Sequence, residues 1–196
     1  GDAQNEATVL ARMGMAVRLS TVIGNDQAGS FLLEHCRREG IRLFEGCVRD
    51  GMATGINVVL VREDGRRNFL TNAQGSLRKL CLGDIRMPFP ESVKIVCFAS
   101  IFVFPKIKAA QLVRIFSQAK KQGITVCADM TKCKHKENAA DMAEAFACID
   151  YLFANEEEAA LLTGEADTKK AAESLLSSGA GHVIIKCGAR GCLLKT

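Results

Sequence analysis

The alternation of short apolar strands with amphipathic helices constrains the fold of this chain more than any other feature. Apolar runs suited to buried strands recur along the sequence, and segments with helical spacing of apolar residues lie between them. The expected strands cover 16–23, 94–100, 124–129, 150–154, 181–188 and 191–196, and the expected helices cover 26–40, 106–123, 136–147, 155–164 and 167–178. Repeated β-α-β units predict an α/β fold, with a parallel sheet covered by helices on both faces.

Residues 53–71 interrupt this alternation. The segment predicts two strands joined at Asp64-Gly65, a dipeptide that favours a tight hairpin turn. The hairpin is polar at one end, which places it outside the main sheet, as a lid over a site or as a contact between two copies of the chain. Because no repeat, linker or low-complexity tract divides the sequence, we expect a single domain over 1–196.

Composition excludes several classes of protein. The chain has 196 residues, 48% of them hydrophobic, which suffices for a sizeable core. A formal charge of +4, with one Tyr and no Trp, argues against a nucleic-acid partner. No apolar run reaches the ~20 residues of a membrane span, so we expect no membrane partner. The nine cysteines form no CxxC pair and several lie in apolar runs, which favours a reducing compartment and predicts a cytoplasmic location.

Candidate ligand-binding residues follow the expected strands. Asp129 ends one strand, Asn155 follows the next, and Lys186 leads into the glycine-rich turn Gly188–Gly191. Ligands of open α/β sheets bind beyond the carboxyl ends of the strands, so these groups are expected to lie at one edge. Glycines let backbone N–H groups approach phosphate, and Lys186 adds positive charge, which indicates a nucleotide with its metal. A tight turn and a strand-end cap remain the structural alternatives.

The stretch NEEEAALLTG also has two interpretations. Asn155 is a strong helix N-cap, Glu158 can complete a capping box, and Gly164 can end the helix. The same two side chains can face a metal–phosphate site if the helix starts at the carboxyl edge of the sheet. Glu156 and Glu157 are expected to be mainly solvated neighbours that the helix dipole favours.

Several motifs resemble, in order, those of the ribokinase-like carbohydrate kinases of the PfkB family. They are GDAQNEATVLARMGMAVRLSTVIG, GNDQAGSFLLEHCRREGI, TGINVVLV, ANEEEAALLTG and IIKCGARGCLL, and they cover nearly the whole chain. The resemblance implies a three-layer αβα sandwich with a mostly parallel central sheet and a small β lid. It also implies transfer of the ATP γ-phosphate to a sugar hydroxyl.

The resemblance assigns roles to individual residues. The residues matched to sugar binding are Gly1, Asp2, Asn5 and Ser100. Those matched to nucleotide binding are Asp129, Asn155, Lys186, Gly188 and Gly191. Glu158 matches the residue that binds magnesium through water. The implied cofactor is Mg²⁺, with ATP as co-substrate and K⁺ as an optional further ion, and the implied partners are a small sugar, ATP and a second copy bound through the lid.

The base of this family is the last Asp of D-T-x-G-A-G-D, a motif that the sequence does not contain. We therefore expect the catalytic Asp beyond Thr196, about thirty further residues before Gly1, and little activity from these residues alone. Two alternatives stay open. One is a nucleoside kinase such as adenosine kinase, with a base stacked on Phe69, Phe102 or Phe104; the other is a truncated, non-catalytic binding protein.

Overall fold

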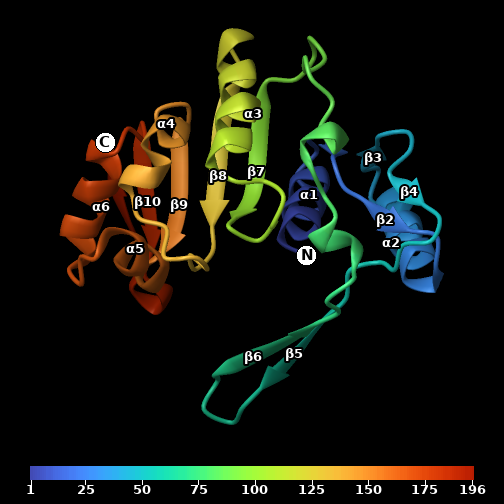
Figure 1. Ribbon diagram of the computed structural model, residues 1–196, viewed down its shortest axis with the longest axis horizontal. Helices are drawn as coiled ribbons and strands as arrows, with labels where there is room; N and C mark the ends of the chain where they lie inside the picture. Colours follow the sequence, from blue (N-terminus) through green and yellow to red (C-terminus); the bar gives the residue numbers. More distant parts are fainter. The chain divides into compact units, whose positions relative to one another are not determined.

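The computed structural model describes residues 1–196, which divide into two compact units (Figure 1). Unit 1 comprises Gly1–Ile85 and Phe104–Lys106, and unit 2 comprises Arg86–Val103 and Ile107–Thr196. A single domain over 1–196 stays a prediction.

Unit 1 contains two pairs of very short parallel strands and two longer helices. Strand β1 pairs with β3, and β2 pairs with β4. The strand expected over 16–23 is therefore split, because its two ends pair with different partners. The elements of this part are α1 (Asp2–Arg12), β1 (Arg18–Leu19), β2 (Ile23–Gly24), α2 (Gln27–Arg38), β3 (Arg42–Leu43) and β4 (Val48–Arg49). A small core of Ala7, Cys36 and Ile41 lies between the two helices and the β1–β3 pair.

The start of helix α2 is fixed by Asp26, as the sequence predicts. Its carboxylate accepts hydrogen bonds from the N–H of Gly29 at 2.7 Å and from the N–H of Thr54 at 2.8 Å. The Thr54 hydroxyl also donates to it at 2.6 Å, and these bonds, led by that hydroxyl, lower the pKa of Asp26. Gly29 has no space for a side chain, because a Cβ atom there would lie 2.0 Å from the carbonyl oxygen of Gly24. Asp26 thus joins the helix to the segment from which the hairpin emerges.

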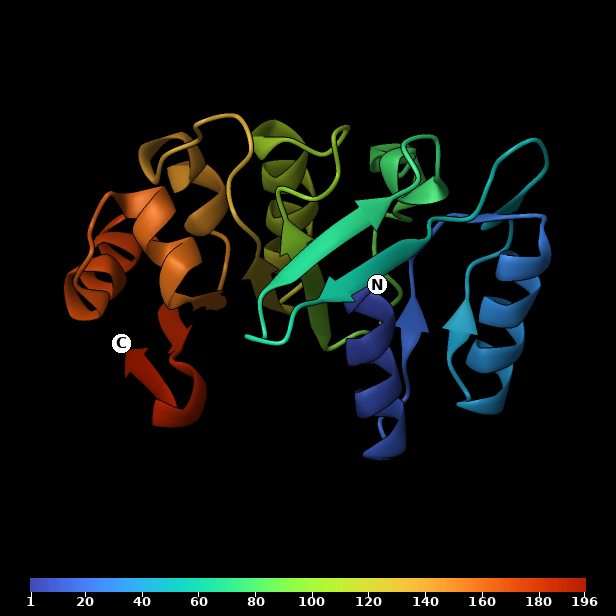
Figure 2. The same ribbon diagram turned by 90° about the horizontal axis from the view of Figure 1, so that it is seen from below.

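The hairpin consists of β5 (Asn57–Val61) and β6 (Arg67–Thr71), an antiparallel pair within the range 53–71 (Figure 2). Its turn contains Gly65 at φ 79°, a conformation that glycine adopts without strain. Asn72 holds its base: the side-chain oxygen accepts from the N–H of Ile56 at 2.9 Å, and the side-chain amide donates to the carbonyl of Thr54 at 2.9 Å. The short turns η1 (Ser76–Arg78) and η2 (Leu82–Asp84) follow.

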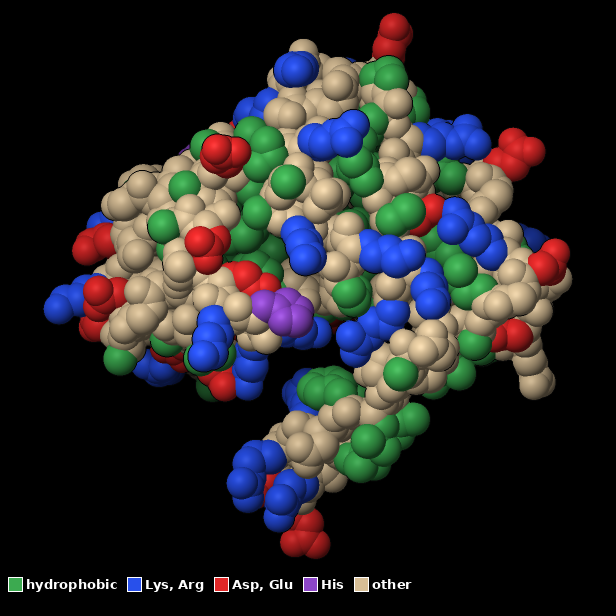
Figure 3. Space-filling view, viewed as in Figure 1, with side chains coloured by type: hydrophobic (Ala, Val, Ile, Leu, Met, Phe, Trp, Pro, Cys, Tyr) green, Lys and Arg blue, Asp and Glu red, His purple; other side chains and the backbone are tan.

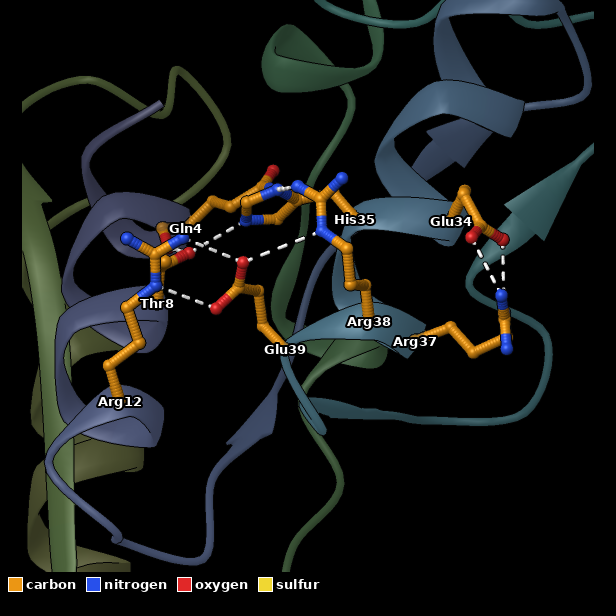
Figure 4. Close-up of polar contacts among 8 residues, drawn as sticks. All are labelled: Gln4, Thr8, Arg12, Glu34, His35, Arg37, Arg38 and Glu39. Carbon is orange, nitrogen blue, oxygen red and sulfur yellow. Dashed lines mark hydrogen bonds and ion pairs between the residues drawn. The ribbon is translucent and has the colours of Figure 1, made fainter.

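A polar network joins α1 to the end of α2 (Figure 4). The Arg12 guanidinium donates two hydrogen bonds of 2.7 Å to the Glu39 carboxylate, which lies between Arg12 and Arg38. The Arg12 hydrogen bond, with smaller contributions from the other nearby positive charges, lowers the pKa of Glu39 to about 2. The Thr8 hydroxyl lies 2.9 Å from Nε2 of His35, which gives this histidine a structural contact. The network links two helices that are 14 residues apart in the chain.

Unit 2 is built on a five-stranded sheet with the order β11-β10-β9-β8-β7. Strands β7 to β10 are parallel, and β11 is antiparallel to β10 because only a tight turn joins the two. The elements are β7 (Ile95–Ile101), α3 (Ala109–Lys121), β8 (Thr125–Met130), η3 (Ala140–Met142), α4 (Ala143–Phe146), β9 (Tyr151–Asn155), α5 (Glu156–Thr163), α6 (Thr168–Ser177), β10 (His182–Lys186), η4 (Gly188–Arg190) and β11 (Cys192–Lys195). The expected α/β class with a mostly parallel sheet is confirmed.

The helices of unit 2 cover one face of its sheet (Figures 1 and 2). Alternate strand residues on the covered face, such as Val126, Leu152 and Val183, are fully buried, whereas Cys97 and Tyr151 on the opposite face are exposed. The reason is topological. Four parallel strands follow each other in one direction, and right-handed crossovers between them all pass over the same face.

The helix expected over 136–147 is shorter in the structure and consists of η3 and α4. Glu137 turns back to accept hydrogen bonds from the N–H groups of Lys134 and His135. Asn138 and Asp141 then exchange reciprocal side-chain-to-backbone bonds of 3.1 Å, which start the helical segment. The polar residues of this segment therefore form its loop and its cap.

Candidate active site

Three of the predicted residues meet at the carboxyl ends of neighbouring strands in unit 2. Asp129 lies near the end of β8, Asn155 ends β9 and Lys186 ends β10, and Lys186 is directly paired with Asn155. The Lys186 ammonium crosses β9 and donates to Oδ1 of Asp129 at 2.7 Å. Both side chains remain partly exposed, at 51% for Lys186 and 24% for Asp129, so a ligand can reach them. The sequence-based expectation that these residues share one edge agrees with this geometry.

Asn155 and Glu158 form a complete capping box at the start of α5. The Asn155 side-chain oxygen accepts from the N–H of Glu158 at 2.8 Å, and Oε2 of Glu158 accepts from the N–H of Asn155 at 2.8 Å. Gly164 ends the helix in the left-handed conformation, at φ 77°. The cap uses one oxygen of each side chain. The Asn155 side-chain amide and the second Glu158 oxygen are left for a ligand.

The Glu158 carboxylate is held in an unfavourable electrostatic environment. Burial is the main cause that raises its pKa, and the like charges of Asp129 and Glu157 raise it further. The bond from the Asn155 N–H and the charge of Lys186 act in the opposite direction. A cation bound between Asp129 and Glu158 would relieve their repulsion, so the two carboxylates suit a positively charged ligand.

The turn after β10 is closed by its own backbone. The Cys187 N–H donates to the carbonyl of Gly191 at 2.8 Å, and the Gly191 N–H donates to the carbonyl of Gly188 at 3.1 Å. Gly188 and Gly191 have φ values of 58° and 86°, which explains why glycine occupies both positions. The N–H groups of Gly188 and Ala189 donate to no protein acceptor, and a phosphate oxygen is a suitable one.

Glu156 is a contact of this turn that the sequence analysis missed. Its carboxylate accepts two hydrogen bonds from Arg190, at 2.7 and 2.8 Å, and one from the Thr168 hydroxyl at 3.0 Å. Glu156 was expected to be a solvated neighbour, and that expectation is wrong because α6 and the turn both reach it. Glu157 agrees better with its prediction: its side chain is 63% exposed and pairs with Lys132. No spacing in the sequence distinguishes these two adjacent glutamates.

The residues matched to sugar binding occupy different parts of the chain. Gly1 is the N-cap of α1, and Asp2 and Asn5 lie exposed in its first turn, within unit 1. Ser100 belongs to unit 2, where it lies buried near the end of β7. Its φ of 65° is unusual for a residue with a side chain, and the register between β7 and β8 shifts there.

A magnesium ion fits the chemistry of this edge. No group of three or more His, Cys, Asp or Glu side chains in the structure could hold a metal by itself. Magnesium, however, keeps several waters and takes one or two protein carboxylates together with substrate phosphates. Asp129 and Glu158 offer such a sparse set of oxygen atoms.

The structure also contains no helix with the length and apolar character needed to cross a membrane.

Comparison with known proteins gives a match to one family. The model of the pfkB family carbohydrate kinases matches residues 1–196. Mouse ribokinase is 26% identical over 202 residues, which cover 99% of this chain and 59% of the relative. Rice fructokinase-2 is 24% identical over 200 residues, which cover 98% of this chain and 59% of the relative. The chain thus spans less than two thirds of the length of these relatives.

Solved structures with low sequence identity share the fold of this chain. Adenosine kinase from Sinorhizobium meliloti has a TM-score of 0.85 at 22% identity. The match covers 99% of this chain and 60% of the adenosine kinase chain. Fructokinase from Vibrio cholerae O395 has a TM-score of 0.79 at 21% identity, in a form with fructose, ADP and calcium ion bound. The match covers 100% of this chain and 65% of the fructokinase chain. These likenesses establish a ribokinase-like fold for the chain.

Proposed function

Because the chain belongs to the pfkB family of carbohydrate kinases, we propose that it contributes the nucleotide side of a kinase that transfers the γ-phosphoryl group of ATP to a sugar hydroxyl. The observation that carries the proposal is the cluster at the carboxyl edge of unit 2. There the Lys186–Asp129 ion pair, the capping box of Asn155 and Glu158, and the glycine turn lie at the carboxyl ends of neighbouring strands. Positive charge, free N–H groups and a carboxylate pair are what a nucleotide with its cation requires.

Each residue of the cluster has a separate role. Lys186 and the N–H groups of Gly188 and Ala189 donate to phosphate oxygens, and the Asn155 amide donates to a further oxygen. Glu158 and Asp129 hold the magnesium ion, Glu158 through water. When bound, magnesium neutralises the charge of the transferring phosphate. Phosphoryl transfer depends mainly on such positioning and charge neutralisation. The role of this cluster in the reaction is therefore to bind and orient the phosphates of ATP.

The sugar side is assigned by family resemblance. We assign Gly1, Asp2, Asn5 and Ser100 to the sugar hydroxyls. Exposed polar groups in the first turn of α1 can bind hydroxyls, and the constrained backbone at Ser100 is typical of a site residue. The relatives include a ribokinase and a fructokinase, so the substrate class that we favour is a small sugar. A K⁺ ion remains an optional further cofactor.

The test is a substrate panel in which ATP-dependent phosphorylation of ribose, fructose and adenosine is followed by ADP release. The complete gene product should act on a sugar, and the 196-residue chain should bind ADP with magnesium but turn over little substrate. Phosphorylation of nucleosides alone would replace the sugar assignment with a nucleoside kinase. If neither the complete gene product nor the 196-residue chain binds nucleotide, a non-catalytic binding role is favoured.

The hairpin supports the further proposal of a homodimer formed through the lid. Apolar side chains are exposed on both faces of β5 and β6, and Figure 3 shows them along the hairpin, with arginine and acidic side chains at its tip. Such a surface on a two-stranded hairpin favours burial against another β element. Exposed positions include Val58, Val61, Phe69 and Leu70. A Val61→Lys/Phe69→Lys variant should be monomeric in light scattering if the wild type is a dimer.

We place the protein in the cytoplasm. All nine cysteines are free thiols in the structure, a condition that a reducing compartment maintains. Fractionation of cells that produce the complete protein tests this assignment, which recovery in an oxidising compartment would refute.

A further inference from the structure

The contacts of Glu156 lead to an inference that rests on the proposed nucleotide site and adds a positioning residue to it. We propose that Glu156 and Arg190 form a clamp that holds the Cys187–Gly191 turn in the conformation that binds the nucleotide. Glu156 is the first residue of α5, directly after the cap residue Asn155. The clamp therefore joins the turn to the helix whose first residues we assign to the phosphate and metal.

Glu156 accepts hydrogen bonds from two separate elements. Arg190 donates from the turn at 2.7 and 2.8 Å, and Thr168 donates from the first residue of α6 at 3.0 Å. A carboxylate at the start of α5 that accepts hydrogen bonds from the turn and from α6 ties that turn to two helices.

The turn needs such a restraint. Two of its five residues are glycines with positive φ, and glycine adopts many alternative backbone conformations at similar cost. Its closing hydrogen bonds lie on the surface, where water competes for the same groups. If the binding-competent conformation is only partly populated, the apparent dissociation constant rises in inverse proportion to that population. The clamp would act on nucleotide affinity by keeping that population high, without touching the nucleotide.

The matched variants are Glu156→Gln and Glu157→Gln, made in the 196-residue chain. They remove the same charge from adjacent positions in the first turn of α5. Glu157 pairs only with Lys132 and has no contact with the turn. The probe is ADP with magnesium, measured by titration calorimetry. Amide hydrogen exchange over 187–191, measured without nucleotide, reports the conformation of the turn independently.

Glu156→Gln should bind ADP about three- to ten-fold more weakly, because the competent population falls by that factor. Exchange over 187–191 should become faster, while Glu157→Gln should keep wild-type values in both measurements. Arg190→Gln should reproduce the effect, and the double variant Glu156→Gln/Arg190→Gln should be no weaker than either single one, since both remove the same interaction.

Equal effects at Glu156 and Glu157, or fully additive effects of the Glu156 and Arg190 changes, would overturn the clamp. If the wild-type chain binds no ADP, the proposed nucleotide site fails, and the exchange measurement alone then decides the clamp. Unchanged exchange in Glu156→Gln would refute the clamp even if ADP binding were weakened.

Discussion

Replacing Glu158 with Gln should separate the effect of this residue on the stability of the fold from its effect on nucleotide binding. The substituted amide keeps an oxygen that can accept the hydrogen bond from the Asn155 N–H, which is 2.8 Å long in the structure. The helix cap is therefore preserved, and the volume of the side chain hardly changes. What is lost is one negative charge beside Asp129. We expect a small change in stability and a large change in the magnesium dependence of nucleotide binding.

The sign of the stability change follows from the raised pKa of Glu158, which burial causes first and the neighbouring carboxylates increase. A carboxyl group whose pKa is higher in the folded protein than in the unfolded chain stabilises the fold at acidic pH. That contribution is lost as the pH rises through the folded-state pKa. At pH 7 Glu158→Gln should therefore be at least as stable as the wild type, with a difference of about 0.5 kcal/mol or less. At pH 4 the variant loses this advantage.

The functional change should be larger. Loss of a residue that supports a metal ion through water typically costs about 10- to 100-fold in metal affinity or activity. The assay is the ratio of ADP dissociation constants with and without magnesium, measured for the wild type and for Glu158→Gln. Glu157→Gln is the control, because it removes a charge from the same helical turn with a side chain that is 63% exposed. The reasoning fails if Glu158→Gln keeps the wild-type ratio, or if the control loses as much.

Three further predictions concern stability. Glu39 has a pKa of about 2 in the fold against an ordinary value of 4.5. Its contribution to the stability of the fold is therefore present above pH 4.5 and lost as the pH falls to about 2. Glu39→Gln should remove this part of the acid-induced unfolding, which circular dichroism measures. Gly29→Ala should destabilise unit 1 by about 1–3 kcal/mol in urea unfolding, because the new Cβ would lie 2.0 Å from the carbonyl oxygen of Gly24, whereas Gly83→Ala, with its nearest atom at 3.9 Å, should be nearly neutral. Phe116→Ala should cost about 3–5 kcal/mol in thermal unfolding, because this ring is fully buried; a loss below about 1 kcal/mol would contradict its place in the core.

Local chemistry made much of the fold predictable. Asp26 and Asn155 are cap residues, and each caps the helix that follows it, because a side-chain oxygen there satisfies an N–H without an intrahelical partner. The Asp64-Gly65 turn likewise lies between the two antiparallel strands of the hairpin. These features depend on neighbours within a few positions, which the sequence places together.

Features that depend on distant pairing were harder to predict. The segment over 16–23 has the sequence of a single strand, yet β1 and β2 within it pair with β3 and β4, which only the fold brings near. The number of helical layers on the five-stranded sheet depends on the order of the strands, and hydrophobic periodicity carries no information about that order.

The two glutamates on either side of Glu157 show how the same limit applies to the site. Glu158 was predictable because its partner, Asn155, lies three residues away and the capping box has a fixed spacing. Glu156 has its partners 12 and 34 residues away, in α6 and in the turn, so no local pattern could reveal it. Both carboxylates nevertheless lie in the first turn of one helix, at the carboxyl edge of one sheet. A helix that starts at this edge can thus use one glutamate to face the ligand and another to hold the loop that binds it.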